Sequence, residues 1–262
     1  MLDFIYYPVS AVLWLWHTLF ASILGIPSGP AWVLAIIFLV MTLRALLIRP
    51  FLAQLQFQRK LALIGPELKE IQRKHADDKE KQAVEVRKLQ QQHGFNPLLG
   101  FLPMIGQIMV FVGLFHVLNS FHAGVANYVF STAQVQSFLS ASLFGAPLST
   151  SLSHAGGAFG SVAVVVVPLL LIATVATHFT ARFSVARQRE TAPEQTAQVR
   201  VMNTLSMWAF PLGTLVTGAL WPVAILLYFV TQNAWTFVQQ HLVYRRFDAE
   251  EAVPALPATR TE

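Results

Sequence analysis

Residues 158–181, AFGSVAVVVVPLLLIATVATHFTA, form an apolar run that no charged side chain interrupts. A helix needs about 20 apolar residues to cross the hydrocarbon core of a bilayer, and this run is long enough. It lies inside a longer stretch, from Leu89 to Ala181, that holds no Asp, Glu, Lys or Arg. The run therefore predicts a membrane-spanning helix, and the rest of the chain has to be interpreted around a bilayer.

Other apolar regions of spanning length lie at residues 30–51, 97–119 and 201–243. The last region is long enough for two spans. The Leu220-Trp221-Pro222 turn divides it, because proline fits the first turn of a helix. This division gives spans at 201–219 and 222–243. The sequence therefore predicts an all-α, polytopic membrane protein with five core transmembrane helices, in one membrane domain that covers residues 30–246.

The composition agrees with a membrane protein and disfavours an enzyme. Of the 262 residues, 55% are hydrophobic and 12% are charged, whereas a soluble domain carries roughly 25% charge. The chain has no cysteine, which excludes disulfides, thiol catalysis and cysteine zinc sites. It contains no HExxH, GxSxG or P-loop motif, and its eight histidines are scattered. We therefore expect neither an enzyme nor a bound metal.

The positive charges predict the orientation. All eighteen Lys and Arg residues fall within residues 44–88, 182–200 and 245–260. Lys and Arg beside membrane spans stay on the cytoplasmic side. With these three segments inside, the N-terminus is extracytoplasmic, the C-terminus is cytoplasmic, and residues 120–157 form an outer loop with no role that the sequence assigns. Residues 247–262 are expected to be a disordered cytoplasmic tail.

Residues 1–29 allow two interpretations. They are apolar and aromatic, but Ser10, His17 and Thr18 leave a narrow polar strip. A signal peptide would have a basic start, and the only charged residue here is Asp3. We favour an interfacial helix on the outer leaflet, where Tyr and Trp side chains sit well. The alternative is a sixth span with a cytoplasmic N-terminus.

Residues 52–94 change abruptly to Gln, Lys, Arg and Glu, which are good helix formers. Apolar residues and one histidine recur with the 3, 4, 3, 4 spacing of a coiled-coil seam, at Leu61, Ile64, Leu68, Ile71 and His75. Residues 76–78 suit a turn, and Val86 and Leu89 can then face the first helix. The pattern predicts a cytoplasmic helical hairpin. The alternative is a solvated helical loop without a partner.

Arg44 lies inside the first predicted span, six positions before Pro50. An arginine at the centre of a bilayer costs about 2.5–3.5 kcal/mol on insertion scales. Its long side chain can reach the cytoplasmic headgroups. Alternatively, the guanidinium faces a water-accessible cavity that opens to the cytoplasm. Position alone does not decide between these two readings.

The polar residues in the other spans favour the cavity. Gln232, Thr236 and Gln239 fall near one face of the last span. A single polar residue of this kind is ordinary interhelical contact, at about 0.6 kcal/mol. No Asp or Glu lies within a predicted span to neutralise Arg44. The polar residues taken together, with this unpaired arginine, favour an aqueous groove in the inner half of the membrane. The predicted groove residues are Arg44, Gln107, Asn203, Thr204, Gln232, Thr236 and Gln239.

Three segments carry a resemblance to a known family. NPLLGFLPM at residues 96–104, followed by Gln107 and Phe111, resembles the second core span of the YidC/Oxa/Alb membrane insertases. Leu227-Tyr228-Phe229, with Asn233 and Gln239-Gln240, resembles their last span. TLRALL at residues 42–47, followed by Pro50, is similar to their arginine-bearing first span, and the opening LDFIYYP at residues 2–8 resembles actinobacterial members.

The resemblance implies a bacterial cell-membrane insertase and chaperone that takes nascent membrane proteins into the lipid bilayer. It implies five core spans around a groove that is open to the cytoplasm and to lipid but closed outside, with Arg44 as the groove cation. It implies that the protein needs no cofactor. It also implies that the protein works alone or beside the Sec translocon, on chains received from ribosomes. We expect a monomer, since a groove that opens to lipid needs no second copy.

Two features depart from the family pattern. Trp221-Pro222-Val223-Ala224 replaces the usual Pro-[Ala/Ser]-Gly before the last span, and the short tail puts direct ribosome docking in doubt.

The alternative function is a small-solute transporter or channel. That class predicts a pathway through both leaflets and often an inverted repeat, and the sequence contains no convincing repeat.

Overall fold

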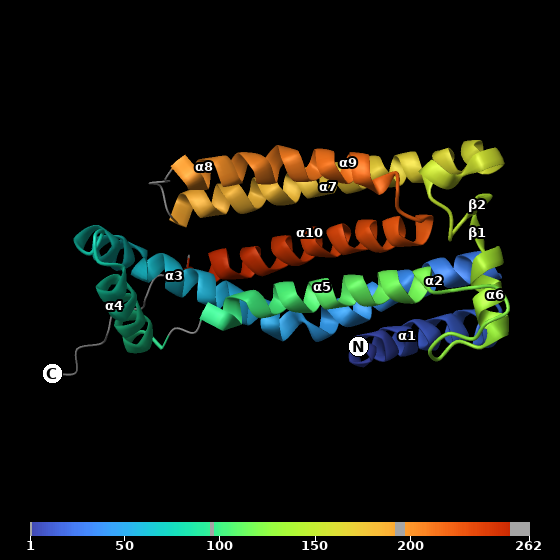
Figure 1. Cartoon of the computed structure of the whole chain (residues 1–262), viewed down its shortest axis with the longest axis horizontal. Coiled ribbons are helices and arrows are strands. Elements are labelled where there is room, and N and C mark those ends of the chain that lie inside the picture. Colours follow the sequence, from blue (N-terminus) through green and yellow to red (C-terminus); the bar gives the residue numbers. More distant parts are fainter. Residues whose placement is uncertain (1, 95–96, 192–196, 252–262) are drawn as a thin grey trace.

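The computed structural model describes residues 2–94, 97–191 and 197–251. Long helices run side by side along the long axis of the molecule (Figure 1). The N-terminal half contains α1 (Asp3–Thr18), the π-helical η1 (Leu19–Ile23), α2 (Ser28–Leu46), α3 (Ile48–Lys74), α4 (Lys79–Gln92) and α5 (Pro97–Asn119). The C-terminal half contains α7 (Phe159–Thr191), α8 (Ala197–Thr204), the π-helical η4 (Leu205–Ala209), α9 (Phe210–Gly218) and α10 (Val223–Glu251). The prediction of a mostly helical chain is confirmed.

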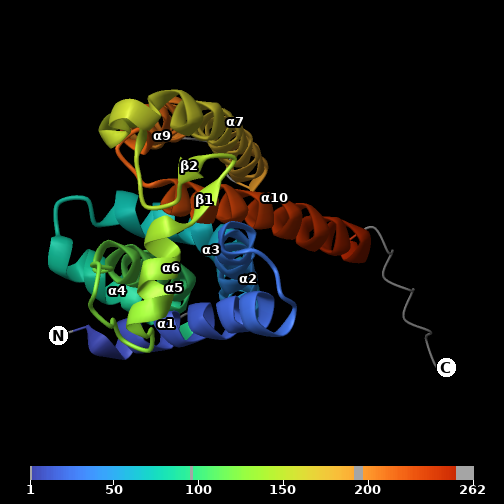
Figure 2. The same ribbon diagram turned by 90° about the vertical axis from the view of Figure 1, so that its right-hand side faces the viewer.

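Small elements connect α5 to α7. They are α6 (Thr132–Ser140), the antiparallel strands β1 (Ser142–Leu143) and β2 (Ala146–Pro147), and the 3-10 turns η2 (Leu152–His154) and η3 (Gly156–Ala158). They lie at one end of the bundle, and α3 and α4 lie at the other (Figure 1). Viewed along the bundle, α10 lies between α7 and α9 on one side and α2 and α5 on the other (Figure 2).

Several helices are suited to a membrane. Among the described residues, three stretches are long and apolar enough to cross one: Asp3–Ile23, Ser28–Leu46 and Gly156–Ala186. Ile105–Asn119 is a shorter apolar helix. Apolar helices that can span a membrane are therefore confirmed, and the count of five core spans stays a prediction.

The helix bounds differ from the predicted spans where proline intervenes. α5 has the predicted bounds, but α2 ends at Leu46 instead of continuing to residue 51. Pro50 has no N–H to bond to the Leu46 carbonyl group, and it is well tolerated in the first turn of the next helix, α3. At the other end, α10 continues to Glu251, so the start of the predicted tail is helical. Residues 252–262 of that tail lie outside the described residues.

α1 packs along α2 and α5 with Ile5, Val9 and Leu13 buried. In the view along the bundle it is seen lengthwise, so it crosses those helices obliquely (Figure 2). An oblique helix suits the membrane surface, but its apolar length also suits a span. The interfacial position therefore stays a prediction.

Helices α3 and α4 contact each other, and the predicted seam between them stays a prediction. Ile64 on α3 and Leu89 on α4 are buried, whereas the side chain of Leu61 lies outside the described residues. Asp78 caps the N-terminus of α4, and its side chain accepts a hydrogen bond from the Lys81 amide at 3.0 Å. This bond lowers the pKa of the Asp78 carboxyl, so the cap is complete at neutral pH and is lost only as the carboxylate becomes protonated in acid.

An aromatic cluster fixes the segment between α5 and α7 to the bundle. Trp32 on α2 is fully buried, and its ring lies 3.8 Å from the ring of His17, centroid to centroid. Three phenylalanines of the predicted outer-loop region surround it: Phe121, Phe130 and Phe138. The Trp32 indole N–H donates to the Ser137 hydroxyl at 3.2 Å. The loop is therefore a packed cap over the end of α2 and not a loose connection.

Gly29 permits the close approach of this cap to α2. A Cβ atom at residue 29 would overlap the carbonyl oxygen of Ser142 in β1. Gly29→Ala is therefore expected to lower the free energy of unfolding by about 1–3 kcal/mol, the usual range for overpacking. The thermal midpoint of the detergent-purified protein measures this loss. Gly157→Ala is the matched control, because open space surrounds that position; equal midpoints for the two variants would contradict the prediction.

Candidate functional site

Arg44 is held between two helices by neutral oxygen atoms. It lies in the last turn of α2 and is half-buried. Its Nε donates to Gln232 Oε1 at 2.8 Å, and its Nη2 donates to Thr236 Oγ1 at 2.6 Å. Both acceptors belong to α10 and lie one turn apart, so they face α2 together. We call Arg44, Gln232 and Thr236 the arginine cluster.

Each acceptor of the cluster is itself fixed. The Thr236 hydroxyl donates to the Gln232 carbonyl at 2.9 Å, which leaves its oxygen free to accept from Arg44. The Gln232 side chain is only 8% exposed. The acceptors are thus positioned before any ligand arrives.

The third helix of the site is α5. Gln107 donates from Nε2 to the Tyr228 hydroxyl at 2.6 Å. Tyr228 is buried and lies one turn before Gln232 on α10, so Tyr228, Gln232 and Thr236 share one face at i, i+4 and i+8. The polar side chains therefore extend from α2 across α10 to α5.

The other three predicted residues lie on α10 and α8. Gln239 accepts a hydrogen bond from the Trp235 indole at 2.8 Å within α10. Thr204 donates to the Arg200 carbonyl at 3.0 Å, and Asn203 beside it is buried. Both belong to α8, which carries no member of the arginine cluster. Three of the seven predicted residues therefore meet at one point, and Gln107 contacts Tyr228, one helical turn before Gln232 on α10.

Tyr228 is a member of the site that the polar-residue pattern did not single out. A buried tyrosine usually finds a hydrogen-bond partner for its hydroxyl, and here the partner is Gln107. The sequence feature that indicates Tyr228 is its position four residues before Gln232, on the polar face of the last span.

No carboxylate in the described part of the chain neutralises the positive charge of the site. No Asp or Glu occurs between Leu89 and Ala181 or between Arg200 and Arg245. The hydrogen bonds of Arg44 to Gln232 and Thr236 end on an amide and a hydroxyl oxygen, which stabilise the guanidinium without cancelling its charge. In the part of the chain that the structure describes, no three His, Asp or Glu side chains gather at one point. The arrangement can bind an anionic or strongly hydrogen-bonding group by electrostatic attraction.

Comparison with known proteins gives consistent similarities over the whole chain. A family model described as "60Kd inner membrane protein" matches residues 24–250. A protein named "Membrane protein insertase YidC" from Mycobacterium tuberculosis (strain H37Rv) is 43% identical over 282 residues, which cover 99% of this chain and 77% of the relative. The matched range includes every residue of the arginine cluster.

More distant proteins of the same name are also similar. One from Mycobacterium leprae is 42% identical, with 95% of this chain and 72% of the relative covered. One from Streptomyces avermitilis is 31% identical, with 94% of this chain and 58% of the relative covered. The similarity thus extends through the helices that carry the site.

Proposed function

The chain belongs to the 60Kd inner membrane protein family, that of the YidC membrane protein insertases, and on this premise we propose that it moves nascent membrane proteins into the lipid bilayer through a hydrophilic groove. The groove is lined by the arginine cluster and by Gln107 and Tyr228. Its direct partners are the client chain and the surrounding lipid of a bacterial membrane.

The observation that supports the groove is the half-buried position of Arg44, which has no carboxylate partner among the residues that the structure describes. Placing a guanidinium among membrane helices is costly, so such residues usually serve a function. An acidic segment of a client supplies the missing negative charge. The attraction is strong because a partly dry site screens charges less than water does.

The physical mechanism needs no hydrolysis. A client's hydrophilic segment must cross an apolar slab about 30 Å thick. A wet groove that reaches partway through shortens the distance over which polar groups lose their hydration. The apolar part of the client then moves between the helices into lipid. Hydrophobic transfer and the membrane potential drive the movement, and the acidic segment is released on the outer side.

The orientation follows from the charges. We take five spans, formed by α2, α5, α7, α8 to α9, and α10. If the N-terminus is outside, the described segments that contain Lys and Arg then all lie on the cytoplasmic side. In this topology the groove opens to the cytoplasm, and the α3–α4 hairpin projects there, where it recruits or guides clients. α1 lies on the outer leaflet. The protein acts as a monomer, alone or beside the Sec translocon, on chains delivered by ribosomes.

Reconstitution of the purified chain in liposomes tests the function directly. We expect a single-span client, made in a cell-free system, to become protease-protected in these liposomes and not in empty ones. A trapped fluorescent dye should stay inside throughout, because a groove closed on one side forms no pore. Dye release without a client, together with absent insertion, would instead indicate the transporter or channel alternative.

A further inference from the structure

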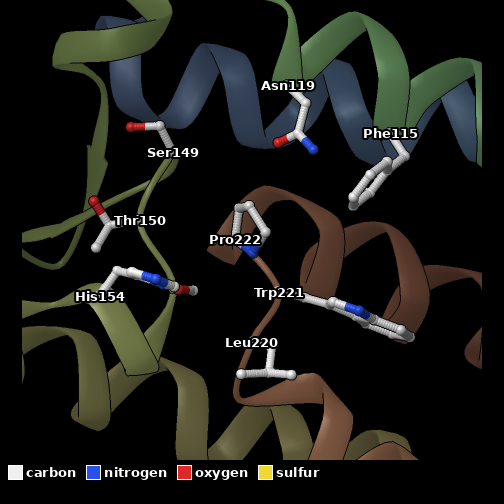
Figure 3. A pocket seen from close by; sticks show the side chains of 9 residues that line it. Phe115, Asn119, Ser149, Thr150, His154, Leu220, Trp221 and Pro222 are labelled. Atoms are coloured by element: carbon white, nitrogen blue, oxygen red, sulfur yellow. The ribbon is translucent and has the colours of Figure 1, made fainter.

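A second polar site lies at the opposite end of the α5–α10 contact from Arg44. It is a pocket of about 310 Å³ between the end of α5, the segment that leads into η2, and the turn before α10. Figure 3 shows Asn119 and Phe115 directed from α5 toward the Trp221-Pro222 turn, with the His154 ring directed toward the same turn from the other side. We call this the Asn119 pocket.

The pocket offers free hydrogen-bonding groups but no charge. Its lining contains no Asp, Glu, Lys or Arg. The side chains of Asn119, Ser149 and Thr150 have no hydrogen-bond partner among the described residues. His154 is held through Nδ1 by the hydroxyls of Ser151 and Ser153, at 3.0 and 2.9 Å, which leaves Nε2 available. Amide, hydroxyl and imidazole groups beside an indole match the donors, acceptors and apolar parts of a peptide, whatever its sequence.

Aromatic rings separate this pocket from the arginine cluster. Phe111 lies 6.0 Å from Trp221 and 5.8 Å from Tyr228, ring centroid to ring centroid. Trp221 lines the pocket, whereas the Tyr228 hydroxyl accepts the hydrogen bond from Gln107 at the Arg44 site. We call Phe111, Trp221 and Tyr228 the aromatic seal. These three rings lie between the Asn119 pocket and the arginine cluster, along the contact between α5 and α10.

The order of these groups along α10 defines a path. Val223 begins α10 beside the pocket, and Gln232 lies nine residues further on, or about 14 Å at 1.5 Å per residue. A hydrophilic segment that leaves Arg44 toward the outer side meets the aromatic seal first. The Asn119 pocket supplies the first polar side chains beyond it.

We propose that the Asn119 pocket is an exit site that binds the hydrophilic segment of a client peptide after it has passed the aromatic seal. The inference rests on the proposed function, since it assumes that a segment passes Arg44 outward. Binding by uncharged groups retains the segment briefly without selecting its sequence. It also replaces the hydrogen bonds to water that the segment lost within the membrane.

Disulfide crosslinking tests the exit site, because the chain has no cysteine of its own. The client is a single-span protein with one cysteine in its acidic N-terminal segment, stalled while attached to the ribosome. Under mild oxidation, Asn119→Cys and Ser149→Cys should each form the disulfide with the client several-fold more than Ala133→Cys. Ala133 is the matched control, since it is exposed on α6 at the same end of the bundle but does not line the pocket.

Protease protection of the client in the same samples separates the two proposals. If the client is inserted but crosslinks to residue 119 or 149 no better than to residue 133, the exit site is wrong and the insertase function stands. If no client is inserted by the cysteine-free parent, the proposed function itself fails.

Discussion

Arg44→Ala is expected to slow the insertion of a client with an acidic N-terminal segment by roughly 10- to 100-fold, because a hydrogen bond with a charged partner contributes about 1.5–3 kcal/mol and each 1.4 kcal/mol is about tenfold. Among the residues that the structure describes at the site, the guanidinium is the one cation, and it is already held by Gln232 and Thr236. Its loss removes the attraction for acidic client residues. The measurement is the rate of protease protection in liposomes that contain the variant.

Two comparisons identify charge as the cause. Arg44→Lys should recover part of the rate, since Lys keeps the charge but not the planar group that reaches two acceptors at once. Neutralising the acidic residues of the client should make Arg44→Ala and the parent more alike, as expected for two interacting groups. Arg49→Ala, which removes an exposed cation near the start of α3, is the matched control. Equal rates for Arg44→Ala and the parent would exclude the role of Arg44.

Sequence spacing predicts that Gln232 and Thr236 share a helix face, but it does not predict which helix that face contacts. The i, i+4 relation of Gln232 and Thr236 holds in any helix, so their common face could be predicted without tertiary structure. That Arg44 would meet this face depends on the packing of α2 against α10, which spacing does not encode. Asn203 and Thr204 were grouped with the site because they are polar and near the predicted inner side. In the structure their helix, α8, carries none of the cluster residues.

The fold could be predicted where the apolar pattern is long and uninterrupted. Pro97 and Asn119 bound α5 in the structure as in the sequence prediction, because a proline and a polar residue enclose a continuous apolar run. The segment between α5 and α7 had no such pattern. Its order comes from contacts between distant residues, such as Trp32 with Phe130 and Phe138, and no local periodicity indicates them.

Trp32→Ala is expected to lower the free energy of unfolding by about 3–5 kcal/mol, the usual cost of removing a large buried aromatic side chain. Trp32 is fully buried, and its ring contacts His17 from α1 and the phenylalanines of the cap. The substitution therefore removes the contact that joins three separate parts of the chain. In a protein of this size the loss corresponds to a fall of roughly 10 °C in the thermal midpoint, measured in detergent.

Two further variants separate the lost volume from the lost hydrogen bond. Trp32→Phe keeps much of the apolar volume but removes the donor to Ser137, so it should cost only about 0.5–1.5 kcal/mol. Trp208→Ala is the matched control, because Trp208 in η4 is 58% exposed and its removal leaves no cavity. Its midpoint should stay close to that of the parent. If Trp32→Ala and Trp208→Ala shift the midpoint equally, the cap does not depend on Trp32. If Trp32→Phe is as unstable as Trp32→Ala, the hydrogen bond to Ser137, and not the packing of the ring, holds the cap in place.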